Sequence, residues 1–153
     1  LTIAVSPKGF ALSTQDGVVQ PLSNCAASGP SICLQGESQD LGEDFQLAAK
    51  LLAAGEHREG QRVLDAALEQ YDWRRLYGEL VRLKGEHPEL REFHVAASPE
   101  LPWSAVVRLF DVARTRLEKD AYPDAHAFWS AKPKLGASED TRLFDQPIIA
   151  IVQ

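Results

Sequence analysis

Two cysteines, Cys25 and Cys33, are the residues of this chain whose spacing most directly suggests covalent chemistry. They lie eight positions apart in a segment rich in serine, glycine, asparagine and proline, which is typical of a loop. A lone close pair in such a segment predicts a disulfide that closes a small ring, and therefore an oxidising compartment. The alternative is two reduced cysteines, one of them packed as a small hydrophobic side chain.

Neither metal binding nor catalysis has a recognisable pattern in the sequence. No histidine has a metal-ligand spacing to another histidine or to a cysteine. The four histidines are His57, His87, His94 and His126. The serines lie in no Gly-x-Ser-x-Gly motif, and the glycines form no phosphate-binding loop. We therefore predict a protein that is not an enzyme and needs no cofactor. The alternative is a hydrolase built from residues that are distant in the sequence.

Several aromatic and charged residues are candidates for contacts with a partner. Trp129 follows Phe128 in an irregular, proline-containing segment, where such rings either anchor the loop or offer a binding surface. Trp103 begins an apolar helical stripe, so we prefer core packing to an exposed recognition role for it. Asp111 and Arg114 lie three positions apart on the same predicted helix, where a surface ion pair is expected and an interface contact is the alternative.

The composition describes one globular domain and excludes some classes of function. The chain has 153 residues, 44% of them hydrophobic and 25% charged, which is ordinary for a folded domain. Its formal net charge is -6 and it has no run of Lys or Arg, which argues against nucleic-acid binding. No apolar stretch approaches the ~20 residues that span a bilayer. Because Leu1 opens directly into strand-like sequence, we expect a longer protein with its membrane anchor or export signal upstream.

The first half of the chain predicts a β-hairpin followed by a loop and two helices. Alternating apolar residues in 1–22 are interrupted by turn signals at Pro7 to Gly9 and at Asp16-Gly17. Residues 23–42 are predicted to be a loop. Amphipathic helices are expected over about 45–54, capped by Asp44, and over about 59–71. The expected apolar faces are Phe45, Leu47, Ala48, Leu51 and Leu52 in the first helix, and Val63, Leu64, Ala67, Leu68 and Tyr71 in the second.

The second half predicts helices that alternate with strands. Asp72 caps a helix over 73–86, residues 92–97 form a strand, and an apolar stripe from Trp103 indicates a helix of about 15 residues. Residues 122–140 are expected to be irregular, and the apolar run in 144–152 predicts a central strand buried on both faces. The stripe comprises Trp103, Val106, Val107, Phe110, Ala113 and Leu117. Together these elements predict an α+β fold in which helices cover one face of a mixed sheet.

The stretch from Asp72 to Ala113 resembles the periplasmic domain of the ExbD/TolR family. In that family a strand ending in Ala-Asp is followed by Pro or Val, an aromatic residue, a Val-Val pair, Met-Asp and Ala-Arg. The matching residues here are Ala97, Pro102, Trp103, Val106, Val107, Asp111 and Arg114. Ser98 replaces the usual aspartate and Phe110 the usual methionine. The opening hairpin and a closing strand over 147–152 fall at the corresponding places, and residues 23–71 and 115–146 are insertions.

The resemblance implies a single periplasmic domain over 1–153 that belongs to an accessory subunit of a proton-driven motor. Such a subunit is a single-pass protein of the bacterial inner membrane and couples proton motive force to transport or envelope function. Its anchor would sit in a channel-forming ExbB/TolQ-like protein, and its soluble domain would form a homodimer. The implied ligands of that domain are peptidoglycan or a TonB/TolA-like protein. Two alternatives are a stand-alone periplasmic module that binds a cell-wall polymer or peptide, and a helical adaptor built on residues 44–86.

Overall fold

One mixed β-sheet with helices packed against it forms the part of the chain that this computed structural model describes, residues 1–136 and 141–151. The strands are β1 (Thr2–Ser6), β2 (Gly9–Thr14), β3 (Gly17–Val18), β4 (Ile32–Cys33), β5 (Glu92–Ala97) and β6 (Gln146–Ile151). Their order is β3-β2-β1-β5-β6, and β4 also pairs with β2. Strands β1, β5 and β6 are parallel, whereas β1, β2 and β3 form antiparallel pairs. The predicted α+β class with a mixed sheet is therefore confirmed.

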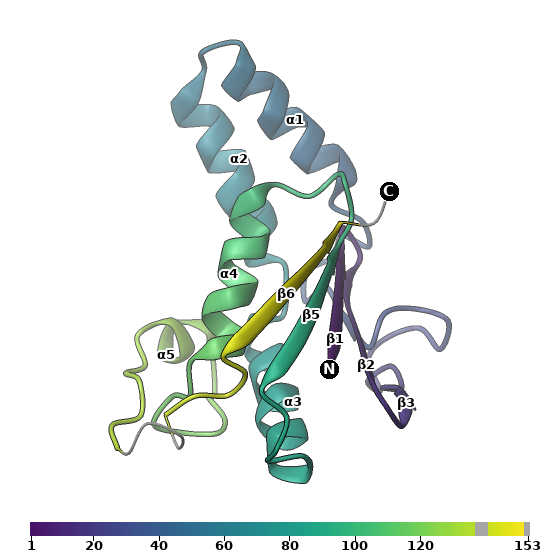
Figure 1. Ribbon diagram of the computed structural model, residues 1–153. Helices are drawn as coiled ribbons and strands as arrows, with labels where there is room; N and C mark the ends of the chain where they lie inside the picture. Colours follow the sequence, from purple (N-terminus) through teal and green to yellow (C-terminus); the bar gives the residue numbers. More distant parts are fainter. Residues whose placement is uncertain (137–140, 152–153) are drawn as a thin grey trace.

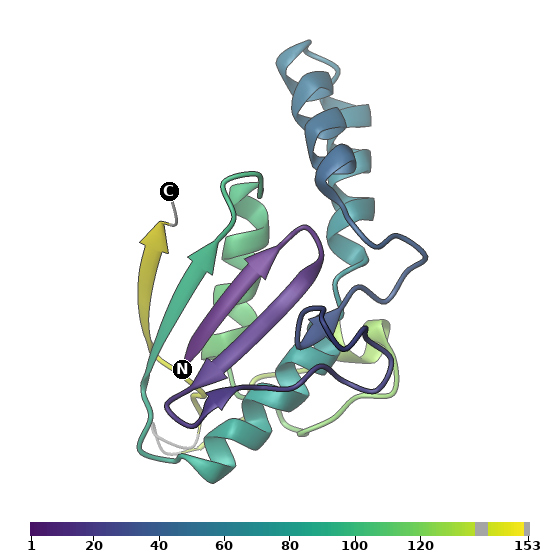
Figure 2. The ribbon, with the colours of Figure 1, turned by 90° about the vertical axis from the view of Figure 1, so that its right-hand side faces the viewer.

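The helices lie on one face of this sheet. They are α1 (Gly42–Ala53), α2 (His57–Glu69), α3 (Trp73–Glu86), α4 (Trp103–Arg114) and α5 (Ala125–Trp129). Figure 1 shows that α1 and α2 form a hairpin that extends beyond the end of the sheet. In Figure 2 the strands lie in front of α3 and α4, so the opposite sheet face is turned toward the viewer without a helix over it.

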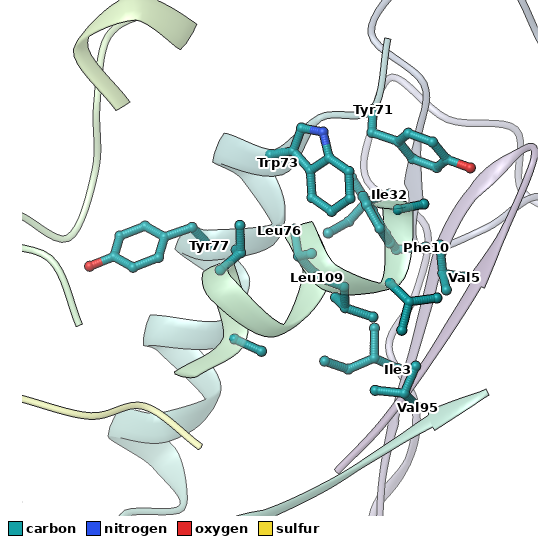
Figure 3. Close-up of a cluster of buried hydrophobic side chains, with 14 of the residues drawn as sticks. Ile3, Val5, Phe10, Ile32, Tyr71, Trp73, Leu76, Tyr77, Val95 and Leu109 are labelled. Atoms are coloured by element: carbon teal, nitrogen blue, oxygen red, sulfur yellow. The ribbon is translucent and has the colours of Figure 1, made fainter. Parts of the chain in front are cut away.

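A single hydrophobic core joins the sheet to the helices. Alternate residues of β1 and β2 point into it, and Ile3, Phe10 and Leu12 are fully buried. Figure 3 shows Ile3 and Val95 of the sheet facing Leu109 of α4. The alternation predicted for the opening hairpin is confirmed, and the bounds of β5 are those predicted.

The predicted loop over 23–42 contains a short strand, so that prediction is wrong in part. Ile32 of β4 pairs with Phe10 and is buried in the core. The buried Ser31 hydroxyl donates to the Val19 carbonyl at 2.7 Å and accepts from the Leu12 amide at 3.0 Å. A strand of two residues is too short to show a hydrophobic period, which is why the sequence pattern did not reveal it.

The helical hairpin differs from its prediction in its cap and in part of its apolar face. Helix α1 begins at Gly42 with Leu41 in the N-cap position, so Asp44 is not the cap. Asp44 instead lies in the first turn, where its negative charge interacts favourably with the helix dipole. Phe45 is buried as expected, but Leu47 is exposed. Helix α2 ends before Tyr71, which is buried beyond its end.

Helix α3 confirms its prediction from the cap to the buried stripe. The Asp72 carboxylate accepts a hydrogen bond from the Arg75 amide at 3.0 Å and so satisfies one of the free donors of the first turn. The buried residues of the helix are Trp73, Leu76, Tyr77, Leu80 and Leu83. Their spacing is the one that the sequence predicted.

Helix α4 confirms its predicted apolar stripe only in part, since Val106 and Ala113 are buried as expected. Trp103 is 62% exposed and Val107 is also exposed, whereas Ala105, Leu109 and Val112 are buried. None of these three buried residues belonged to the predicted stripe. Core packing of Trp103 is therefore a wrong prediction. The helix also ends at Arg114, so the expected length of about 15 residues is too long.

Two further predictions for the C-terminal third are wrong. The segment 122–140 contains helix α5, whose N-cap Asp124 accepts a hydrogen bond from the Ala127 amide at 2.8 Å; residues 137–140 of that segment lie outside the described residues. Strand β6 is at the edge of the sheet beside β5, and not in its centre. Ile148 and Ile149 are exposed there. Val152, the end of the predicted strand, also lies outside the described residues.

Cys25 and Cys33 form the predicted disulfide. It ties the loop at Cys25 to β4, and the Cys33 amide donates to the Cys25 sulfur at 3.0 Å. Such a bond is consistent with an extracytoplasmic location, because thiols in the cytosol are usually kept reduced.

Removing this disulfide is expected to destabilise the protein by about 2–3 kcal/mol, since the open chain gains the entropy of a small loop. The measurement is urea unfolding of the Cys25→Ser/Cys33→Ser variant beside the oxidised protein. Reduced wild-type protein is the control and should match the double variant. An unchanged midpoint in both would contradict the expected stabilising role of the bond.

Candidate functional site

A cleft of about 750 Å³ opens between α5, the facing side of α4, and the start of α3. We call it the aromatic cleft. Its lining residues are Gln35, Glu69, Tyr71, Trp73, Arg74, Arg108, Asp111, Ala125, His126, Phe128 and Trp129. Three of the predicted partner-binding residues, Asp111, Phe128 and Trp129, meet in this cleft although they come from two separate helices. A smaller recess of about 170 Å³ adjoins it and shares these three residues.

Helix α5 is held against α3 by a buried ring and by one arginine. Phe128 is buried against Tyr77, with ring centroids 5.6 Å apart. The Arg74 guanidinium donates to the backbone carbonyls of Tyr122 and Pro123, just before α5 begins. The rings of this segment were expected either to anchor the loop or to offer a binding surface. Phe128 anchors the segment, whereas its neighbour Trp129 stays accessible.

Trp129 lines the cleft and is 48% exposed. Its ring contacts Trp73 and Phe128 edge-on, with centroids 6.5 Å and 4.9 Å apart. The Arg108 guanidinium lies over the indole at 5.9 Å from its centroid and also lies 3.7 Å from an Asp65 carboxylate oxygen on α2. Arg108 and Trp129 therefore form a cation–π interaction within the protein.

Asp111 and Arg114 do not form the ion pair expected of them. Neither side chain forms an ion pair with any residue in the described part of the chain, and only Asp111 lines the cleft. Arg114 is exposed at the end of α4 and outside the cleft. The predicted partner-binding set is thus brought together only in part, because Trp103 and Arg114 lie elsewhere on the same helix.

A second exposed region lies along β6, and we call it the sheet-edge surface. It comprises Ile148 and Ile149 of β6 and Trp103 and Val107 of α4, all of them exposed apolar residues. Ile149 pairs with Val95 and so points to the helix-covered side, whereas Ile148 points to the open side. Trp103 contacts Phe110, with centroids 6.5 Å apart, and Phe110 in turn packs on Phe93 of β5, the neighbour of β6.

A charge cluster fixes the start of this edge strand. Asp145 precedes β6 and accepts hydrogen bonds from Arg91, the closer at 2.6 Å, and from Arg142 at 3.1 Å. The Arg91 guanidinium, with a smaller contribution from Arg142, holds the pKa of the Asp145 carboxyl well below its ordinary value. The cluster therefore stabilises the parallel register of β6 on β5 at neutral pH.

Two kinds of site are not found among residues 1–136 and 141–151. No group of three or more His, Cys, Asp or Glu side chains is placed to hold a metal ion there. None of the helices in those ranges has the length and apolar character that crossing a bilayer requires.

Comparisons with protein-family models, with curated proteins and with solved structures found no match to this chain. The candidate sites therefore depend on the chain's own geometry. Sequence reasoning missed Arg108, Arg74 and Glu69 as lining residues of the cleft, since charged residues on helices ordinarily face water. It also missed the exposure of Ile148 and Ile149, for which Pro147 was the available signal, because proline in a sheet favours an edge strand.

Proposed function

We propose that this chain is the extracytoplasmic binding domain of an ExbD/TolR-type accessory subunit. It acts by binding a second copy of itself and partner proteins, and not by catalysis. In this role it couples a proton-driven motor in the inner membrane to transport or to another envelope function. The motor partner is a channel-forming membrane protein of the ExbB/TolQ type.

Two features of the chain support the proposal. The order hairpin, helix, strand, helix, strand that the resemblance implies corresponds to β1-β2, α3, β5, α4 and β6. The disulfide between Cys25 and Cys33 is consistent with residence outside the cytoplasm. The segments that the resemblance treats as insertions carry the α1–α2 hairpin and α5, both outside this series.

The observation that carries the proposal is the open edge of β6. One side of this strand has no hydrogen-bonded neighbour in the described part of the chain, and Ile148 and Ile149 are exposed. Natural proteins usually protect an edge strand of this kind with charges, a bulge or a covering element, because it can template pairing with another chain. Pro147 has no backbone N–H and so protects only the start of this edge. The apolar part that follows it is a surface for strand addition, either by a second copy or by an extended partner segment.

We expect the protein to dimerise in solution through this edge, and Ile149→Lys to weaken the dimer at least about tenfold, which corresponds to ~1.4 kcal/mol. The measurement is sedimentation velocity over a concentration series. Val18→Lys is the matched control, since Val18 is an exposed, β-branched residue of the opposite edge strand β3 and is 66% exposed. It should leave the dimer unchanged.

Two outcomes would overturn the proposal. A wild-type protein that stays monomeric at the highest concentration, or a dimer that Val18→Lys disrupts and Ile149→Lys does not, would rule out the β6 edge. The motor assignment is tested separately by purifying the full-length protein in mild detergent. We expect it to copurify with a channel-forming membrane protein, and its recovery without one would refute the motor role.

A further inference from the structure

The aromatic cleft contains carboxylates that have no partner among the described residues, whereas both of its arginines already interact with other groups of the protein. The carboxylates of Glu69 and Asp111 line the cleft, and neither forms a hydrogen bond or ion pair with any described residue. Both residues are exposed, so water satisfies them in the ligand-free protein. They are hydrogen-bond acceptors, so they favour a ligand that supplies donors.

Four side chains that line the same cleft and carry donors, those of Arg74, Arg108, Gln35 and Trp73, already interact with other groups of the protein. Arg74 donates to two backbone carbonyls before α5, and Arg108 is shared between Asp65 and the face of Trp129. The Gln35 amide donates to the Glu69 carbonyl at 2.7 Å, and the Trp73 indole donates to the Leu68 carbonyl at 2.8 Å. A ligand that needed these donors would therefore have to break existing interactions, whereas a ligand that supplies donors would not.

Trp129 adds a surface that attracts cations. Its exposed indole lies in the same cleft as Asp111, and the position of Arg108 over the ring shows that the indole accepts a guanidinium in this fold. An aromatic face beside a carboxylate is the usual way in which proteins recognise ammonium and guanidinium groups, because the ring quadrupole and the charge act in the same direction. The apolar stem of such a side chain can pack on the remainder of the indole.

We propose that the aromatic cleft binds a lysine or arginine side chain, with its charged group between the free carboxylates and its stem on Trp129. The net charge of -6 favours the approach of a cation over that of an anion. The cleft of about 750 Å³ is within the size range of small-ligand sites and accommodates one such side chain with part of its backbone. The proposal is independent of the motor assignment, because it depends only on the residues of the cleft.

The test is an NMR titration of the whole chain that follows the indole N–H signals of its three tryptophans. The probes are N-acetyl-arginine-N-methylamide, its lysine counterpart and spermidine, with the citrulline and glutamate derivatives as neutral and anionic probes. We expect a saturable shift of the Trp129 signal for the cationic probes, at about millimolar concentration as befits one side chain. The isosteric but neutral citrulline probe should bind at least about tenfold more weakly, since it lacks the charge-assisted interaction.

Matched variants show whether the named residues are responsible. Asp111→Asn is expected to weaken the arginine probe about tenfold, and Trp129→Leu by a factor of about three or more. Glu92→Gln removes the same charge from the open side of the sheet, and Trp103→Leu removes the exposed tryptophan outside the cleft. Both controls should bind as the wild type does, and all four positions are exposed, so folding should be retained.

The titration also distinguishes a basic side chain of a polypeptide from a free amine as the source of the cationic group. Binding of the amino-acid probes at Trp129 supports a polypeptide ligand, whereas binding of spermidine alone would replace it by a free amine. The proposal is overturned if the citrulline or glutamate probe binds as well as the arginine probe. It is equally overturned if Asp111→Asn has no greater effect than Glu92→Gln.

Discussion

Replacing Gly9 by alanine is expected to destabilise the protein by about 3 kcal/mol or more, through backbone strain and through overpacking. Gly9 has φ +132°, in the region that side-chain-bearing residues rarely adopt. A Cβ atom at this position would lie 2.2 Å from the backbone oxygen of Ile32, which is far inside contact distance. Because that oxygen belongs to β4 and Ile32 is buried, the strand cannot move aside without disturbing the core.

The expected result is a large fall in the urea midpoint, measured by circular dichroism. Gly17→Ala is the matched control, since Gly17 has a similar φ of +124° in the next turn, but a Cβ atom there would meet no other atom within 4 Å. Gly17→Ala should therefore lower the free energy of unfolding only by the cost of the backbone strain, which is of order 1 kcal/mol. The difference between the two variants isolates the close approach of β4, and equal effects would contradict that approach.

The parts of this fold that the sequence predicted well are those where one physical signal is repeated. Helix α3 has a capping aspartate and five apolar residues at helical spacing, so an error at one position would leave the pattern intact. Strand β5 alternates between buried and exposed residues over its first half. The opening hairpin combines alternation with two turns, in which Gly9 and Gly17 both have the positive φ that their positions suggested.

The misplaced parts are those where apolar residues alone had to indicate burial. The run Pro147-Ile148-Ile149 is as apolar as a central strand, and apart from Pro147 only the position of β6 in the sheet order shows that it is an edge. Helix α4 shows the converse, because Trp103 is large and exposed while Ala105 is small and buried. The size of a side chain therefore does not show which face of a helix packs on the core.

The candidate site was predictable in its aromatic members and not in its charges. Phe128 and Trp129 were candidates because rings in an irregular segment require a physical reason. Asp111 was expected to pair with Arg114 along α4, but it lies in the cleft, where Arg108 of the same helix turns to Asp65 and Trp129. The spacing of residues along α4 alone does not predict this arrangement, because the two residues that Arg108 contacts, Asp65 and Trp129, belong to other helices.

Truncating Tyr71 to alanine is expected to have the other large effect on stability, about 3–5 kcal/mol, because it leaves a cavity in the core. The fully buried ring lies between Phe10 of the sheet, at 5.1 Å between centroids, and Trp73 of α3, at 5.3 Å. It also stacks on Phe45 of α1 at 6.4 Å. Figure 3 shows Tyr71, Trp73 and Phe10 gathered at one end of the core. Tyr71 therefore connects the α1–α2 hairpin to the sheet, and Tyr71→Ala should loosen both.

Tyr71→Phe separates the ring from its hydroxyl. The hydroxyl donates to the Ser6 carbonyl at 2.8 Å, so this variant should lose only about 1 kcal/mol. Burial, with a contribution from the nearby Asp40 carboxylate, raises the pKa of the Tyr71 hydroxyl well above its ordinary value. The unfolded chain therefore releases this proton first, and wild-type stability should fall as the pH rises above ~10, the ordinary tyrosine pKa. Urea unfolding between neutral pH and the alkaline range should show a smaller fall in stability for Tyr71→Phe. The buried Tyr77, whose pKa burial also raises, contributes to the fall that remains. An equal fall in the stability of both proteins would mean that Tyr71 ionises as readily in the folded protein as in the unfolded chain. For Tyr71→Ala, a small loss of stability would mean that other contacts hold the α1–α2 hairpin to the sheet.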